Sequence, residues 1–125
     1  MINAITHVSF IVADTARAVV FYRDVLGLAL YAERPELGFP GAWFCVGEQQ
    51  IHLLELPNPD PVDGRPAHGG RDRHVAFTVD DLDALVQSLE AAAVVYTLSR
   101  SGRRALFCRD PDGNALEFIE TCGET

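Results

Sequence analysis

Alternating apolar and polar side chains mark two stretches of this chain, residues 7–14 and 74–81. Their sequences are HVSFIVAD and HVAFTVDD, so His7 corresponds to His74 and each later position has its counterpart at the same offset. A period of two is typical of half-buried strands, with one face toward a core and the other away from it. The pattern therefore predicts a duplicated module in which His7 and His74 begin matching strands and point to matching sides.

Helical spacing follows each of these two strands. Asp14-Thr15 predicts the start of a helix that ends at Gly27, and Asp80 or Asp81 predicts the start of a second helix. The second helix carries its apolar residues at helical spacing, at Leu82, Leu85, Val86 and Leu89. Further strands are expected at 28–32, 42–46 and 50–56 in the first copy, and at 94–98, 104–109 and 115–120 in the second. Each copy is therefore predicted to be a βαβββ module.

The two modules are expected to form one domain, residues 1–125. Module one is residues 5–56, module two is residues 74–120, and the linker, residues 57–73, holds four of the seven prolines and lacks periodicity. A half-chain of roughly 60 residues would be only marginally stable alone, so a shared core is expected. His68 in the linker is predicted to be solvated, and the tail from Thr121 is predicted to fray.

Acidic residues outnumber basic ones, 18 to 10, which leaves a formal net charge of -8 and a pI near 4.8. This balance disfavours sequence-independent binding to nucleic acid or to an anionic membrane. The sequence shows neither an apolar run of about 20 residues nor a charged leader, so a cytoplasmic location is expected. Cys45, Cys108 and Cys122 form no CxxC pair and are interpreted as buried or incidental thiols.

The repeat also selects one residue in the last strand of each module. With Phe44 aligned to Phe107 and the second hairpin turn longer by two residues, His52 falls opposite Glu117. Three imidazoles and a carboxylate, His7, His52, His74 and Glu117, make a donor set suited to Zn, Ni, Mn, Fe or Co. Without His52 the other three would form the two-His, one-carboxylate face used by non-haem Fe(II) oxygenases. The alternative is that His52 is an ordinary strand histidine whose ring nitrogens have hydrogen-bond partners and bind no metal.

The sequence also contains candidate catalytic and substrate-binding residues. Glu117 is the predicted catalytic proton carrier, whereas Glu55 and Glu120 lie one register away and are left out of the site. Trp43 is predicted to line an apolar cleft, with core packing as the alternative. Three arginines flank a glycine turn, Arg100, Arg103 and Arg104, and a guanidinium fork suits a carboxylate or phosphate. Arg104 is the substrate-binding candidate, and a solvated loop is the alternative.

These motifs together resemble the vicinal oxygen chelate superfamily, which includes glyoxalase I, bleomycin-resistance and fosfomycin-resistance proteins, methylmalonyl-CoA epimerase and extradiol dioxygenases. The resemblance covers residues 5–120 and rests on the paired histidine strands, the FYxxVLGL helix end and the DPDGNxxE segment before the last strand. It implies an α+β fold whose modules form an open, barrel-like mixed sheet around a metal-binding cleft. It also implies a homodimer, and a metal held by the four positions named above.

The resemblance favours a divalent-metal-dependent enzyme of the glyoxalase I-like type, a lyase or isomerase acting on a small oxygenated substrate. Such an enzyme would chelate the substrate and stabilise an enediolate or related oxyanion. One alternative is an Fe(II)-dependent ring-cleaving dioxygenase, since redox-active iron on the same triad would do different chemistry. A second alternative is a non-catalytic protein that sequesters a drug or metabolite, as bleomycin-resistance proteins do.

Overall fold

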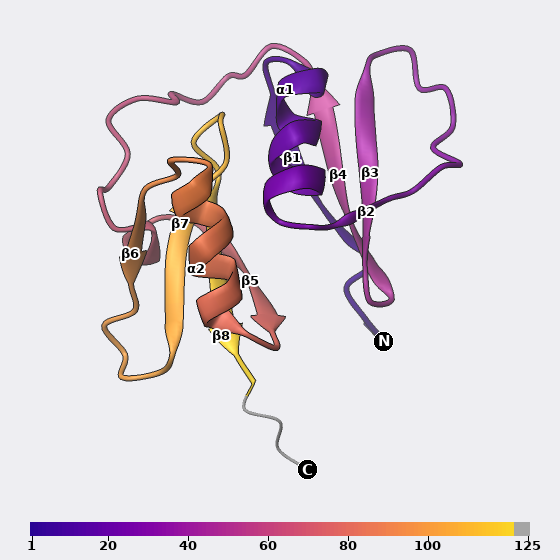
Figure 1. The fold of residues 1–125 in the computed structure, drawn as a ribbon. Helices are drawn as coiled ribbons and strands as arrows, with labels where there is room; N and C mark the ends of the chain where they lie inside the picture. Colours follow the sequence, from indigo (N-terminus) through magenta and orange to yellow (C-terminus); the bar gives the residue numbers. More distant parts are fainter. Residues whose placement is uncertain (122–125) are drawn as a thin grey trace. The chain divides into compact units, whose positions relative to one another are not determined.

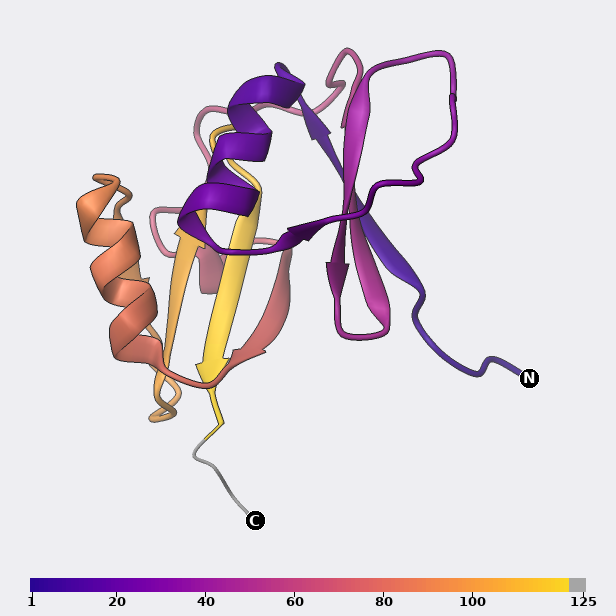
Figure 2. The same ribbon diagram turned by 45° about the vertical axis from the view of Figure 1, so that its right-hand side comes forward.

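The computed structural model describes residues 1–121 and contains the predicted βαβββ module twice. The chain divides into two compact units, Met1–Asp60 and a second unit that begins at Pro61. Each unit holds one four-stranded mixed sheet with a helix on one of its faces (Figures 1 and 2). The predicted α+β class with tandem βαβββ modules is therefore confirmed.

The first unit follows the predicted order of elements closely. Its elements are β1 (His7–Val12), α1 (Thr15–Val19), η1 (Val20–Val25), β2 (Ala29–Leu30), β3 (Gly41–Val46) and β4 (Gln49–Glu55). The sheet order is β1-β4-β3-β2, with β1 parallel to β4 and the other neighbours antiparallel. A parallel β1–β4 pair needs a long crossover, which the helix and the β2–β3 hairpin provide.

The second unit repeats this topology. Its elements are η2 (Gly69–Arg71), β5 (His74–Val79), α2 (Leu82–Ala91), β6 (Tyr96–Leu98), β7 (Ala105–Arg109) and β8 (Ala115–Glu120). The sheet order is β5-β8-β7-β6, with β5 parallel to β8. The short 3-10 helix η2 lies in the segment predicted to be an irregular linker. The predicted fraying beyond Thr121 and the interpretation of Cys122 lie outside the described residues.

The helix starts match the sequence signals, whereas the end of the first helix differs. The carboxylates of Asp14 and Asp81 accept hydrogen bonds from backbone N–H groups three residues on, as N-caps do. After Val19 the first helix continues as a π-helix, which the apolar spacing did not predict. Gly27 ends it with φ +79°, and Ala93 takes the corresponding left-handed conformation in the second unit at φ +57°.

Each core lies between the sheet and its helix. The large, fully buried side chains on this side are Val12, Tyr22, Phe44 and Leu53 in the first unit and Leu89, Leu106 and Leu116 in the second. Burying each such side chain is worth roughly 1.5–3 kcal/mol. Because strand side chains alternate, the residues between these positions point to the opposite face of the sheet. That opposite face carries the predicted metal ligands.

Strand register confirms the match between His52 and Glu117 and corrects the alignment of the preceding strands. His52 pairs with Ser9 and Glu117 with Ala76, and each of these partners is the third residue of its strand. Across the hairpins, however, His52 pairs with Trp43 and Glu117 with Phe107. Trp43, not Phe44, is therefore the counterpart of Phe107, and the second hairpin is longer by one residue, not two. The two phenylalanines misled the alignment because Phe44 belongs to the helix-facing side.

Two carboxylates at the strand ends hold the helix N-termini in place. Glu55 Oε1 accepts a hydrogen bond from the Thr15 N–H at 2.8 Å, and Glu120 Oε2 accepts one from the Leu82 N–H at 3.0 Å. The first-turn N–H groups of a helix have no intrahelical acceptor, so these carboxylates satisfy donors that would otherwise depend on water. Both residues thus serve the fold on the helix side of the sheet.

We expect Glu55→Ala to lower the free energy of unfolding by about 1 kcal/mol, because a charge-assisted hydrogen bond to the helix terminus is lost. Urea unfolding followed by circular dichroism measures this. Glu48→Ala, which removes an exposed carboxylate from the β3–β4 turn, is the matched control and should change stability little. Equal effects of the two substitutions would contradict the capping role of Glu55.

Candidate metal centre

His74 and Glu117 form a close pair in the second unit. The register that pairs β5 with β8 brings the His74 Nε2 atom to 3.2 Å from Glu117 Oε1. On the other side of the ring, His74 Nδ1 lies 2.9 Å from the backbone carbonyl oxygen of Asp72. A carbonyl only accepts, so Nδ1 carries the hydrogen and donates it. In the neutral ring, Nε2 therefore presents its lone pair to the carboxylate.

Two lone-pair atoms this close, Nε2 and Oε1, repel each other unless something positive lies between them. Either a proton occupies this place, giving an imidazolium–carboxylate pair, or a metal ion does. Metal–ligand bonds of about 2.0–2.2 Å to N and O allow two ligands of one cation to stand about this far apart. A ligand histidine also usually donates its second ring N–H to a carbonyl or carboxylate, as His74 does to Asp72. The geometry and the chemistry of this pair fit a divalent metal.

His7 and His52 form the corresponding pair in the first unit. Their rings are stacked, with centroids 4.0 Å apart and planes 16° apart. Thr6 Oγ1 lies 2.9 Å from His7 Nδ1, and Gln50 Oε1 lies 2.8 Å from His52 Nε2. The Gln50 oxygen accepts from His52 Nε2–H, so in the neutral ring His52 Nδ1 carries the lone pair. Each of these rings is thus held by a neighbour through one nitrogen, as is common for histidines that bind a metal.

Trp43 holds His52 in position from the other side. The indole and imidazole rings are 3.8 Å apart and nearly parallel, with an interplanar angle of 2°. Burial, which disfavours the charged imidazole, and charge repulsion by His7 and Arg34 together lower the pKa of His52 to about 4. His52 is therefore neutral at neutral pH, which is the state that binds metals. The predicted cleft residue Trp43 lies on the ligand side of its sheet.

The predicted four donors are thus arranged as two pairs, one in each unit. In residues 1–121, no third His, Cys, Asp or Glu joins either pair to make a group of three. Glu117 is also held through its second oxygen, Oε2, which lies 3.3 Å from the Arg103 guanidinium. The carboxylate is buried, with 6% of its side chain exposed.

Arg104, the arginine selected from the sequence for substrate binding, does not join these side chains. Its guanidinium binds Glu120 at 2.6 Å and Asp83 at 2.8 Å, which places it on the helix side of the sheet. Arg103 is the arginine that contacts Glu117. The sequence contained a signal for this choice: counting back in twos from Phe107, which pairs with Glu117, leads to Arg103 and not to Arg104.

The prediction that His68 is solvated is wrong. Its side chain is buried, its Nδ1 atom lies 2.7 Å from Thr97 Oγ1, and its ring meets the Phe107 ring edge to face at 4.8 Å. Phe107 also meets the His74 ring edge to face, at 5.1 Å. The linker histidine therefore supports the aromatic ring that packs against a predicted ligand. The burial of His68 could not be predicted from the sequence, since a proline-rich segment gives no periodic signal.

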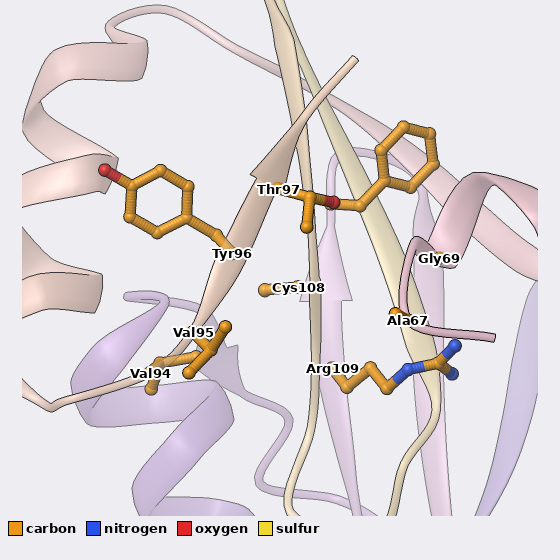
Figure 3. Close-up of a pocket in the computed structure, with 9 residues that line it drawn as sticks. Ala67, Gly69, Val94, Val95, Tyr96, Thr97, Cys108 and Arg109 are labelled. Atoms are coloured by element: carbon orange, nitrogen blue, oxygen red, sulfur yellow. The ribbon is translucent and has the colours of Figure 1, made fainter. Parts of the chain in front are cut away.

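A pocket of 310 Å³ opens beside Phe107 at the edge of the second sheet, between β6 and the linker (Figure 3). It is lined by Ala67, Gly69, Val94, Val95, Tyr96, Thr97, Phe107, Cys108 and Arg109. Figure 3 shows Tyr96 pointing away from the other lining residues, and its hydroxyl donates to Glu90. Burial and the nearby Asp110 raise the pKa of Cys108 to about 12, so this thiol stays protonated and is a poor nucleophile or ligand.

None of the helices in residues 1–121 combines the length and apolarity that a bilayer span requires.

The sequence matches a known protein family. The model of the Glyoxalase/Bleomycin resistance protein/Dioxygenase superfamily matches residues 4–118. A lactoylglutathione lyase from Haemophilus influenzae is 34% identical over 124 residues, which cover 93% of this chain and 91% of that protein.

Solved structures agree with the sequence matches. A crystal structure assigned to the glyoxalase family, from Bacillus anthracis, superposes with a TM-score of 0.80 at 27% identity and covers 98% of both chains. The E126Q mutant of the fosfomycin resistance protein FosX from Listeria monocytogenes, complexed with Mn(II) and a dihydroxypropylphosphonic acid, has a TM-score of 0.76. It is 17% identical, with coverage of 98% of this chain and 95% of that one, and supports the fold alone.

Proposed function

This chain belongs to the Glyoxalase/Bleomycin resistance protein/Dioxygenase superfamily, and we propose that it is a divalent-metal-dependent enzyme of the glyoxalase type. Its relatives of known name include lactoylglutathione lyases and metallothiol transferases, which point to metal-dependent activity on small molecules. The observation that carries the proposal is the His74 Nε2–Glu117 Oε1 pair, two facing lone-pair atoms with the imidazole anchored at Asp72.

The proposed ligands are His74 and Glu117 from the second module and His7 and His52 from the first. All four are held by neighbouring groups, so little side-chain freedom would be lost on binding. A bound divalent cation, Zn, Ni, Mn, Fe or Co, would supply Lewis-acid stabilisation for an oxyanion that develops on the substrate. We expect the chain to act as a cytoplasmic homodimer, and light scattering on purified protein measures whether it is a dimer.

Glu117 is the proposed proton carrier. Its Oε2 atom would take a proton from one substrate carbon and return it to the adjacent carbon. The substrate would gain and lose no atoms, so the reaction would be an isomerisation. Trp43, stacked against His52, would provide an apolar wall for the substrate. His52, neutral at working pH, would add no charge that opposes cation binding.

Metal content and lyase chemistry test this proposal together. We expect purified protein loaded with Mn(II) or Zn(II) to retain about one ion per chain, and to produce lactoylglutathione from glutathione and methylglyoxal. His74→Ala and His7→Ala should each lose metal and activity. Full metal retention by both variants would overturn the proposal. Tight binding of a small molecule by metal-free protein, without turnover, would favour the sequestering alternative instead.

A further inference from the structure

An exposed arginine covers the buried carboxylate of the proposed metal centre. The Arg103 guanidinium lies 3.3 Å from Glu117 Oε2, and 58% of the Arg103 side chain is exposed, against 6% for Glu117. Arg103 lies on the loop between β6 and β7, where Ser101 Oγ accepts hydrogen bonds at 3.4 Å from its backbone N–H and from Nε. The guanidinium thus meets Glu117 from the solvent side.

A divalent cation and this guanidinium would compete for the same carboxylate. Oε1 already faces His74, so a cation at that pair would stand within a few ångströms of Arg103 and repel it. Most of the Arg103 side chain is exposed, so water can solvate its guanidinium when a cation takes its place at Glu117. Gly102, next to it in the loop, has φ +89° and no atom within 4 Å of the position a Cβ would take, so the loop around it is open.

A displaced Arg103 would remain beside the metal centre with an unsatisfied guanidinium. Its planar fork of N–H donors matches carboxylate and phosphonate oxygens. Arg104, by contrast, is held by two carboxylates, Glu120 and Asp83. Neither carboxylate is a proposed metal ligand, so a bound cation would not displace Arg104. The two adjacent arginines therefore differ in role.

We infer that Arg103 is an exchangeable counter-ion of Glu117: it pairs with the carboxylate in the metal-free protein and with an oxyanion of the substrate once the cation is bound. This inference rests on the proposed function, because it needs a divalent ion at Glu117. It assigns the substrate class as one that carries a carboxylate or phosphonate near the oxygens that bind the metal.

Calorimetric titration of the metal-free protein with Mn(II) tests the first part of the inference, that Arg103 competes with the cation for Glu117. Arg103→Gln should bind Mn(II) about fivefold or more tightly than the wild type, because the competitor is gone. Arg103→Lys should fall between them, and Arg104→Gln, the matched control, should leave Mn(II) affinity unchanged. Unchanged or weaker binding by Arg103→Gln would overturn the inference while leaving the proposed function intact. Failure of the wild type to bind Mn(II) would instead reject the proposed function.

Oxyanion binding to the Mn(II)-loaded protein tests the second part, that the displaced Arg103 binds an oxyanion of the substrate. Methylphosphonate and acetate serve as separate probes. Loaded wild type should bind one of them at least about fivefold more tightly than loaded Arg103→Gln, and which probe it is distinguishes a phosphonate from a carboxylate substrate. Arg104→Gln should behave as the wild type. Equal affinities for both probes in wild type and Arg103→Gln would overturn the substrate assignment.

Discussion

Replacing Glu117 by glutamine is expected to lower the affinity for Mn(II) on the order of 100-fold or more and to abolish turnover. The amide keeps the size of the side chain but loses the negative charge that attracts a cation and accepts a proton. Substitutions of residues that only hold a metal ligand in place already cost roughly 10–100-fold in metal affinity, and a direct ligand should cost at least as much. Calorimetric titration with Mn(II) measures the change.

Glu120→Gln is the matched control for this experiment. The same isosteric change is made three residues further along β8, at a carboxylate that binds the Leu82 N–H and Arg104. It should lower the melting temperature, because a helix terminus loses a charged acceptor, while Mn(II) affinity stays near that of the wild type. If Glu117→Gln kept the wild-type affinity, Glu117 would not be a ligand and the proposed mechanism would fail.

Asp72→Asn is expected to lower the free energy of unfolding by about 1–3 kcal/mol at pH 7, because hydrogen bonds from charged donors are lost. The Asp72 carboxylate accepts from Arg65 Nε and Arg109 Nη1, both at 2.8 Å, and from the Arg73 N–H at 2.8 Å. Only 10% of its side chain is exposed. It therefore fastens the segment before β5 to the end of β7.

The stability that Asp72 contributes should depend on pH. Hydrogen bonding to Arg65 foremost, and then to Arg109 and the Arg73 N–H, holds the pKa of Asp72 well below its ordinary value of 3.8. A carboxyl whose pKa is lowered by folding stabilises the native state above the unfolded pKa and loses this contribution as pH falls toward the folded pKa. The difference between wild type and Asp72→Asn should thus be full at pH 7 and shrink below about pH 4.

Urea unfolding at pH 7, 4 and 2.5 measures this difference. Asp63→Asn, at an exposed carboxylate of the same segment, is the control and should change stability little at any of these values. A wild-type advantage over Asp72→Asn that persisted unchanged at pH 2.5 would show that the effect comes from side-chain shape and not from charge.

Local signals in the sequence were sufficient for much of the fold. Period-two alternation located β1 and β5, and Asp14 and Asp81 marked the helix starts, because strand faces and helix caps depend on residues only a few positions apart. The duplication then supplied long-range information: once two modules share a topology, the residue that occupies a place in one identifies its counterpart in the other. That is why His52 and Glu117 could be matched from the sequence.

Contacts between distant segments escaped this reasoning. Trp43 rather than Phe44 is the counterpart of Phe107, because hairpin register depends on turn length, and a shift of one residue exchanges the two faces of a strand. The burial of His68 depends on Thr97 and Phe107, which lie far along the chain and leave no mark on the linker. The choice between Arg103 and Arg104 likewise depends on which face each one reaches.

The amino-acid sequence alone determined the two βαβββ modules, their equivalent positions and the identity of the four candidate donors, because these follow from repetition and short-range periodicity. Only the tertiary structure decided that His74 Nε2 faces Glu117 Oε1, that Asp72 anchors the imidazole and that Arg103 occupies the remaining carboxylate oxygen. The physical reason is that hydrogen-bond partners and ring orientations depend on distances of a few ångströms across strands, whereas spacing along the chain indicates only which face of a strand a residue occupies.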